Sequence, residues 1–128
     1  GKVKLFEGFD GYGNGGQTRD FIYVKDVVKV NFFFWDHPEL KGIYNCGTGH
    51  AHTFNTLAQG VLKYFGSGKL EYVPFPEVLK GKYQSFTEAD SSKLLAAGYD
   101  GGFTDIETAV AEYCELLDKN EGYLRIER

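Results

Sequence analysis

Alternation of apolar and polar residues predicts four short strands in this chain. The segments with this pattern are residues 3–7, 19–24, 42–46 and 69–74. The second segment (RDFIYV) is rich in aromatic and β-branched residues, which favour extended structure, and Pro74 ends the fourth. All four strands are short, and segments of helical pattern separate most of them along the chain.

Helical spacing predicts four helices. They are expected over residues 25–35, from an N-cap at Thr53 to about Phe65 with Gly66 as the stop, from Asp90 to Gly98, and from a capping box at Thr104-Asp105-Ile106-Glu107 onward. In the last helix the apolar residues recur at the spacing of a single face. The pattern as a whole predicts a mixed α/β fold in which short strands alternate with helices.

The helix expected over residues 25–35 is apolar on nearly every side. Its apolar residues are Val27, Val28, Val30 and the run from Phe32 to Trp35. A helix of this kind is buried on more than one face. It is therefore either a central core helix of this chain or a helix whose second face is covered by a partner domain. The residues alone leave both interpretations open.

Composition is that of an ordinary globular domain. The chain has 128 residues, of which 42% are hydrophobic and 25% are charged, so it is long enough to bury a core and too apolar to be disordered. The net charge of −4 argues against nucleic acid or an anionic membrane as the main partner, because both bind basic surfaces. No apolar run approaches the roughly 20 residues that span a bilayer.

Glycine is the most unusual component, with 17 residues. Residues 8–18 form a glycine-dense loop that contains a literal GxGxxG at residues 11–16. A dinucleotide site needs a strand before that motif and a helix after it, whereas a strand is expected here, so the loop is interpreted as a surface loop. The turn Gly47-Thr48-Gly49 could offer backbone N–H groups to an anion, although a simple tight turn is the favoured interpretation.

Few side chains have the spacing of catalytic or metal-binding groups. Cys46 and Cys114 are expected to be free thiols, and a zinc site formed by Cys46, His50 and His52 matches no familiar spacing. The GxSxG, HExxH and Tyr-x-x-x-Lys patterns are absent, so no catalytic residue is assigned. Arg19 either binds a phosphate group or pairs with a carboxylate such as Asp20 or Asp26, and the residues favour neither.

Several phrases of the sequence resemble one family when they are taken together. They are KLFEG at residues 4–8, RDFIYVKDV at 19–27, IYNCGTG at 43–49, EYVPFP at 71–76, LKGKYQ at 79–84, FTEAD at 86–90 and AAGYD at 96–100. The chain is similar to the C-terminal part of the ADP-L-glycero-D-manno-heptose 6-epimerases, a branch of the extended short-chain dehydrogenase/reductase family. The Arg-Asp-Phe and Asn-x-Gly-Thr-Gly phrases occur across nucleotide-sugar enzymes, whereas LKGKYQ and FTEAD point to the heptose branch.

The resemblance implies a fold and an activity. It implies the α/β substrate-binding part of an extended epimerase without its Rossmann domain, so that the chain is a fragment. The parent enzyme would use NADP to invert ADP-heptose at C6″ for lipopolysaccharide core synthesis, with the cofactor site and the Tyr-x-x-x-Lys pair mostly in the absent N-terminal half. The fragment is then expected to be inactive alone. Its expected location is the bacterial cytoplasm. A first strand that begins at once agrees with such a fragment, and the free cysteines agree with a reducing compartment.

The resemblance also implies site residues. Phe6, Glu7 and Gly8 match a stretch that lines the ADP-sugar site, and Arg19 and Tyr83 match substrate-binding residues. The family joins this stretch to the arginine by a shorter connector that begins with a small polar residue. Phe9 and the glycine-rich insert replace it here, which puts the position after Gly8 in question as a ligand contact.

Organisation and partners follow from the same resemblance. Residues 1–118 are expected to form the substrate-binding portion and residues 119–128 a charged tail. The parent would be a homo-oligomer, and the fragment would self-associate through apolar faces left bare. The alternatives are a fragment of another nucleotide-sugar epimerase or dehydratase, and a free-standing nucleotide-sugar-binding module without catalysis.

Overall fold

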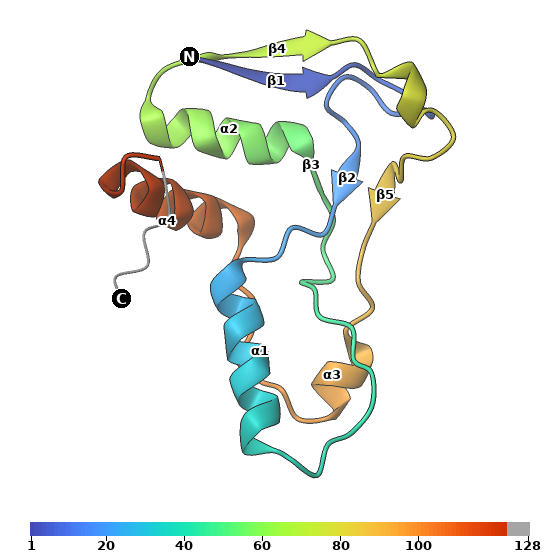
Figure 1. Cartoon of the computed structure of the whole chain (residues 1–128), viewed down its shortest axis with the longest axis vertical. Helices are drawn as coiled ribbons and strands as arrows, with labels where there is room; N and C mark the ends of the chain where they lie inside the picture. The colour runs from blue at the N-terminus through green and yellow to red at the C-terminus, as the bar shows by residue number, and fades with distance from the viewer. Residues whose placement is uncertain (123–128) are drawn as a thin grey trace.

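The computed structural model describes residues 1–122, and it alternates short strands with helices as expected (Figure 1). Along the chain the elements are β1 (Lys2–Phe6), β2 (Thr18–Arg19), α1 (Val24–Asp36), β3 (His52–Thr53), α2 (Phe54–Phe65), β4 (Lys69–Val73), the 3₁₀ helix η1 (Glu77–Leu79), β5 (Phe86–Thr87), α3 (Ser92–Ala96) and α4 (Ile106–Lys119). The mixed α/β class is therefore confirmed. The predicted helix at residues 25–35 and the predicted strands at residues 3–7 and 69–74 are confirmed within one or two residues.

Two small sheets organise the strands. β1 and β4 run parallel, in register from Lys2 opposite Lys69 to Phe6 opposite Val73. In the second sheet β2 lies between β3, which is antiparallel to it, and β5, which is parallel to it. Helix α2 lies along the β1–β4 pair and α4 packs against α2, whereas α1 and α3 lie at the opposite end of the molecule (Figure 1). The short sheet of β3, β2 and β5 thus lies between two groups of packed elements, one formed by β1, β4, α2 and α4 and the other by α1 and α3.

Local capping explains where α2 and α4 begin. The Thr53 hydroxyl accepts a hydrogen bond from the Thr56 N–H at 3.0 Å, and Gly66 ends the helix at φ 63°, so both ends of α2 are as predicted. For α4 the predicted capping residue was wrong. Asp105 is the N-cap, with its carboxylate accepting from the Thr108 N–H at 3.0 Å, because the Thr104 hydroxyl is engaged by a distant carboxylate instead.

Two predicted strands do not form. In residues 19–24 only Arg19 is extended in a ladder, since the Asp20 side chain binds backbone N–H groups of other segments and the chain turns into α1 at Val24. Residues 42–46 contain no strand, because no described segment pairs with them and Ile43 is 86% exposed. A short helix does form before Gly98, but the expected cap at Asp90 was wrong: the N-cap of α3 is Ser91, and the Asp90 carboxylate accepts from the Ser92 N–H one residue earlier in the turn.

Helix α1 has one packed face and one bare face. Val30 forms a core with Leu94 and Tyr99, and the partly buried side chains around it are Phe33, Phe34, Tyr44, Cys46 and Phe103. On the other side, Val28 and Phe32 are exposed and Trp35 is 82% exposed. Within the described residues α1 is therefore a one-sided core helix, and nothing in this part of the chain covers its second apolar face.

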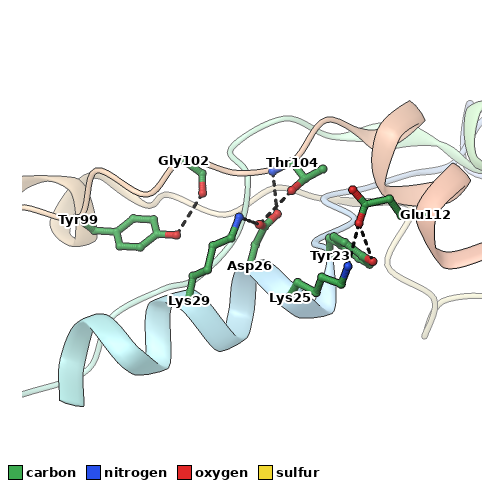
Figure 2. A network of polar contacts seen from close by, with 8 residues as sticks. All are labelled: Tyr23, Lys25, Asp26, Lys29, Tyr99, Gly102, Thr104 and Glu112. Atoms are coloured by element: carbon green, nitrogen blue, oxygen red, sulfur yellow. Dashed lines mark hydrogen bonds and ion pairs between the residues drawn. The ribbon is translucent and has the colours of Figure 1, made fainter. Parts of the chain in front are cut away.

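A buried carboxylate ties the start of α1 to the segment before α4 (Figure 2). Asp26 is fully buried and accepts hydrogen bonds from the Thr104 N–H at 2.7 Å, the Thr104 hydroxyl at 3.0 Å and the Lys29 ammonium at 2.8 Å. Burial by itself would raise the pKa of the Asp26 carboxyl, but these bonds outweigh it and hold the pKa below its ordinary value. We call Asp26, Lys29 and Thr104 the Asp26 network.

Both cysteines are free thiols, with Cys114 buried and Cys46 partly buried, as expected. Burial raises the pKa of both thiols. No helix within residues 1–122 is long and apolar enough to cross a membrane.

Candidate functional site

Three of the five site residues expected from the sequence lie together. Phe6 is the last residue of β1, Arg19 belongs to β2, and Tyr83 follows η1. The Phe6 and Tyr83 ring centroids are 6.4 Å apart, and the Arg19 guanidinium carbon lies 4.9 Å from the Tyr83 centroid. Residues separated by more than 70 positions in the sequence thus form one cluster at the junction of the two sheets.

Aromatic rings frame this cluster. Phe75, which follows β4 and is buried, makes edge contacts with Phe6 at 5.4 Å and with Tyr83 at 5.3 Å between centroids. Phe54, the first residue of α2, lies with its ring centroid 5.9 Å from the Arg19 guanidinium carbon. We call Phe6, Arg19, Phe54, Phe75 and Tyr83 the Arg19 cluster. It presents apolar ring surface around a single positive charge.

The carboxylate partners considered for Arg19 are wrong. No carboxylate within residues 1–122 makes an ion pair with Arg19, and its only hydrogen bond runs from Nη1 to the Thr18 carbonyl oxygen at 2.7 Å. Asp26 is engaged in its own network, and Asp20 is bound on the other side of the chain. Because a ring contact provides no hydrogen-bond acceptor of the usual kind, most of the Arg19 N–H donors make no hydrogen bond within residues 1–122 and are free for an anion.

The neighbouring Asp20 has the opposite environment. Its carboxylate accepts hydrogen bonds from the backbone N–H groups of Thr48 at 2.9 Å, Gly49 at 2.9 Å and Ala89 at 3.1 Å, and also from the Thr48 hydroxyl. Burial would raise the pKa of Asp20, but these donors outweigh it and lower the pKa. The turn Gly47-Thr48-Gly49 therefore does bind an anion through its N–H groups, and the anion is a carboxylate of the same chain.

Glycine is required in this turn by close packing. A Cβ atom added at Gly47 would lie 2.4 Å from the Ala89 Cβ and 2.7 Å from an Asp20 carboxylate oxygen. This packing agrees with the interpretation as a tight turn, and the Thr48 and Gly49 N–H groups that could have met the anion of a ligand are engaged by Asp20 of the same chain. Asp20 holds it beside β2, and this also fixes the chain direction immediately after Arg19.

Glu7 and Gly8 lie next to the Arg19 cluster in the chain, and their backbone serves structural roles. The Glu7 N–H extends the β1–β4 ladder to the Val73 carbonyl at 2.8 Å, and its own carbonyl accepts from the buried Gln17 amide. The Gly8 N–H donates to the Asn14 side chain, and a Cβ at Gly8 would lie 2.3 Å from the Tyr12 carbonyl oxygen. Both residues are exposed, so their role as ligand contacts stays a prediction.

The glycine-rich insert is an ordered loop that folds back on β1 and α2. The Gly15 N–H donates to the Phe6 carbonyl, and Asn55 of α2 binds the loop through its own N–H and side chain. Phe9 stacks on Phe75 with centroids 4.5 Å apart. The GxGxxG at residues 11–16 is followed along the chain by β2 and not by a helix, and the first turn of α2 donates to the carbonyl of Gly15 and not to a ligand, so the described residues do not form a dinucleotide cradle.

A small cavity opens beside the Arg19 cluster. Its volume is about 150 Å³, and its lining residues are Lys4, Leu5, Phe6, Gln17, Phe54 and Tyr83. Lys4 and Phe6 face the same side of β1 because side chains alternate along a strand. The cavity thus combines ring surface, which it shares with the Arg19 cluster, with one lysine, an arrangement that can bind an anionic group attached to an apolar or planar body.

Sequence reasoning missed two contributors to this site. Phe54 was assigned only to a helix start, and Gln17 only to a surface loop, although Gln17 is almost fully buried. Their positions depend on the pairing of β2 with β3, which no local pattern revealed. Phe75 was included in a family phrase, but its place between Phe6 and Tyr83 was not evident.

The histidines form no metal centre in the described part of the chain. No group of three or more His, Cys, Asp or Glu side chains in residues 1–122 could hold a metal ion. His50 and His52 line a separate open pocket, where the Glu88 carboxylate accepts from the Ala51 N–H.

Two curated proteins match most of the chain. Over 117 residues it is 57% identical to the ADP-L-glycero-D-manno-heptose-6-epimerase of Alkalilimnicola ehrlichii. This alignment covers 91% of this chain and 37% of the Alkalilimnicola protein. Over 132 aligned positions it is 49% identical to the protein of the same name from Thiobacillus denitrificans. This alignment covers 91% of this chain and 40% of the Thiobacillus protein. The chain therefore spans less than half the length of these relatives. The model of the NAD dependent epimerase/dehydratase family matches residues 3–47.

Solved structures of nucleotide-sugar epimerases have a similar fold. The UDP-N-acetylglucosamine 4-epimerase of Methanobrevibacter ruminantium is 25% identical with a TM-score of 0.68, covering 85% of this chain and 34% of that chain. The UDP-glucose 4-epimerase of Bifidobacterium longum, solved with NAD⁺ and UDP, is 24% identical to this chain with a TM-score of 0.70. The match covers 94% of this chain and 36% of the Bifidobacterium chain. The expected likeness to one part of an extended epimerase is confirmed.

Proposed function

We propose that this chain, a homologue of the ADP-L-glycero-D-manno-heptose-6-epimerases within the NAD-dependent epimerase/dehydratase family, is the substrate-binding part of such an epimerase. The substrate would be ADP-heptose, which the parent enzyme inverts at C6″. One observation carries the proposal. Arg19, which matches a substrate-binding arginine of the resembled family, has ring contacts on the guanidinium and no carboxylate partner among residues 1–122.

The roles of the site residues follow from their chemistry. The free edge of the Arg19 guanidinium would bind the diphosphate, because its planar donors match phosphate oxygens in pairs. The rings of Phe6 and Tyr83 would contact the ligand beside it, and the Tyr83 hydroxyl, which makes no hydrogen bond within residues 1–122, would be a donor to it. Glu7 and Gly8 would contribute through the exposed strand end.

The chain contributes binding and orientation, and we assign it no catalytic residue. The family name implies a nicotinamide cofactor, which supplies hydride chemistry when it is bound. The described residues do not form a cradle for it. NADP as the specific cofactor, a bacterial cytoplasmic location and a homo-oligomeric parent are further parts of the proposal.

The activity is testable in a chimera. The segment of the Alkalilimnicola relative that matches this chain would be replaced by residues 1–118, and conversion between ADP-D-glycero- and ADP-L-glycero-D-manno-heptose would be followed. We expect epimerisation, and we expect Arg19→Ala in the chimera to raise KM more than it lowers kcat. A folded chimera that converts a UDP-sugar instead would support the other nucleotide-sugar epimerases. A chimera that binds ADP-heptose without converting it would favour a binding module.

The proposal extends to association of the chain itself. The bare apolar face of α1 carries Val28, Phe32 and Trp35. Exposed apolar surface of this kind drives association in water. We therefore propose that the isolated chain self-associates.

A further inference from the structure

We propose that Phe54 is a positioning residue for Arg19, which holds the guanidinium so that its edge faces a phosphate-bearing ligand. This inference rests on the proposed function for the identity of the ligand class. The role itself concerns two side chains of this chain and can be tested without a substrate. Neither the sequence phrases nor the family resemblance assigned a role to Phe54.

The geometry places Arg19 in contact with two rings. Its guanidinium carbon lies 5.9 Å from the Phe54 centroid and 4.9 Å from the Tyr83 centroid. Tyr83 belongs to the loop after η1, whereas Phe54 opens α2, so the two rings come from independent elements. Contacts of this kind stabilise a cation without using its N–H donors.

Phe54 is itself held firmly in place. Its N–H donates to the Gln17 carbonyl at 3.1 Å, and it follows the N-cap Thr53 at the start of α2. Its ring meets the Phe21 ring edge-on, with centroids 5.3 Å apart and an interplanar angle of 86°. The ring is therefore fixed by the helix start on the backbone side and by Phe21 on the ring side.

Ring contacts hold the Arg19 guanidinium in a way that a carboxylate could not, because they leave its N–H donors free. An ion pair would also fix a guanidinium, but a carboxylate would occupy the donors that a diphosphate needs. The single bond from Nη1 to the Thr18 carbonyl leaves the remaining donors available. A ring contact thus orders the side chain in advance and lowers the entropy cost of binding an anion.

Nuclear magnetic resonance of the 128-residue chain tests the positioning directly. Ring currents shift protons that lie over an aromatic face upfield, so the Arg19 side-chain protons should resonate upfield and show cross-relaxation to the Phe54 ring. Phe54→Leu should move these signals towards ordinary arginine values, and Phe54→Tyr should restore them. Phe65→Leu makes the same change at the other end of α2, next to Tyr64, and should leave them unchanged.

A titration with pyrophosphate connects the positioning to binding. We expect Phe54→Leu to raise the dissociation constant about twofold to fivefold, because binding must then order a guanidinium that the ring no longer holds in place, while Phe54→Tyr and Phe65→Leu stay near wild type. Wild-type protein without cross-relaxation between Arg19 and Phe54, or Arg19 signals that Phe54→Leu does not move, would overturn the inference. Absence of pyrophosphate binding in the wild type would instead contradict the proposed diphosphate contact, and the Arg19 signals would still decide the role of Phe54.

Discussion

The Asp26 network and the Arg19 cluster each hold one charged side chain away from bulk water, and they do so in opposite ways. Asp26 is 0% exposed, and protein donors engage both of its carboxylate oxygens. Arg19 is half-buried between rings, and a single carbonyl oxygen accepts from it. One group is saturated by the chain itself, whereas the other is ordered and left with free donors.

The difference separates a structural charge from a charge available to a ligand. A buried carboxylate is costly unless every lone pair is engaged, so Asp26 serves to join α1 to the segment before α4 (Figure 2). A guanidinium fixed by ring contacts has its orientation determined without its donors being used. Asp20 belongs with Asp26 in this respect, although it lies next to Arg19 in the sequence.

Removing the saturated charge should have the largest effect. Asp26→Ala leaves the Thr104 N–H without its acceptor and removes the link between α1 and α4, so we expect the free energy of unfolding to fall by about 3 kcal/mol. Urea unfolding followed by circular dichroism measures it. The control is Lys29→Ala, which should cost no more than about 1 kcal/mol because the Lys29 side chain is 52% exposed. Equal losses from the two variants would show that the ion pair, and not the Thr104 bonds, dominates the network.

Acid should weaken the same network. The pKa of Asp26 and the pKa of Asp20 are lower in the folded chain than the ordinary 3.8, so both carboxylates stabilise the fold above that value. This stability is lost as the pH falls through the folded pKa values, because the unfolded chain takes up protons first. Urea unfolding between about pH 6 and about pH 3 should show that the free energy of unfolding declines as the pH falls. The double variant Asp20→Asn/Asp26→Asn should show a smaller decline. A decline of unchanged slope in that variant would assign acid sensitivity to other carboxylates.

Removing the unsaturated charge should affect binding more than folding. We expect Arg19→Ala to weaken pyrophosphate or ADP binding about tenfold and to lower the free energy of unfolding by no more than about 1 kcal/mol. Calorimetry and urea unfolding measure the two quantities on the same samples. Arg19→Lys, which keeps the charge but not the planar donors, should fall between wild type and Arg19→Ala. A stability loss as large as that of Asp26→Ala would remove the contrast between the two regions.

The bare face of α1 should give the smallest change in stability. Trp35 is 82% exposed, so Trp35→Gln should change the free energy of unfolding by no more than about 0.5 kcal/mol while weakening self-association. Sedimentation velocity over a concentration series measures the association. Val78→Gln is the matched control, because Val78 is 76% exposed on η1, away from α1. A wild-type chain that stays monomeric at high concentration would contradict the proposed association.

Local signals predicted the helices better than the strands. Thr53 and Gly66 bound α2 as expected, because a cap acts on backbone groups a few residues away. The residues at 19–24 have strand-forming side chains, yet Asp20 and Tyr23 turn that segment into the start of α1. The capping residue of α4 was misassigned for the same reason, since Thr104 is engaged 78 positions away by Asp26.

The candidate site was predicted in part. Phe6, Arg19 and Tyr83 came from the family resemblance, and the structure brings them together. Phe54 could not be predicted, because its contact with Arg19 depends on how β2 pairs with β3. Glu7 and Gly8 lie at the adjoining strand end, where they stay predictions as ligand contacts.

The sequence by itself determined the α/β class, both ends of α2, and the relationship to heptose epimerases, because each depends on neighbouring residues or on whole phrases. Only the tertiary structure decided which charges are satisfied. Asp20 finds its donors 28 and 69 positions away, and Asp26 finds Thr104 78 positions away. Those contacts leave Arg19 without a carboxylate, since hydrogen bonds and ring contacts form between groups that folding brings within a few ångströms.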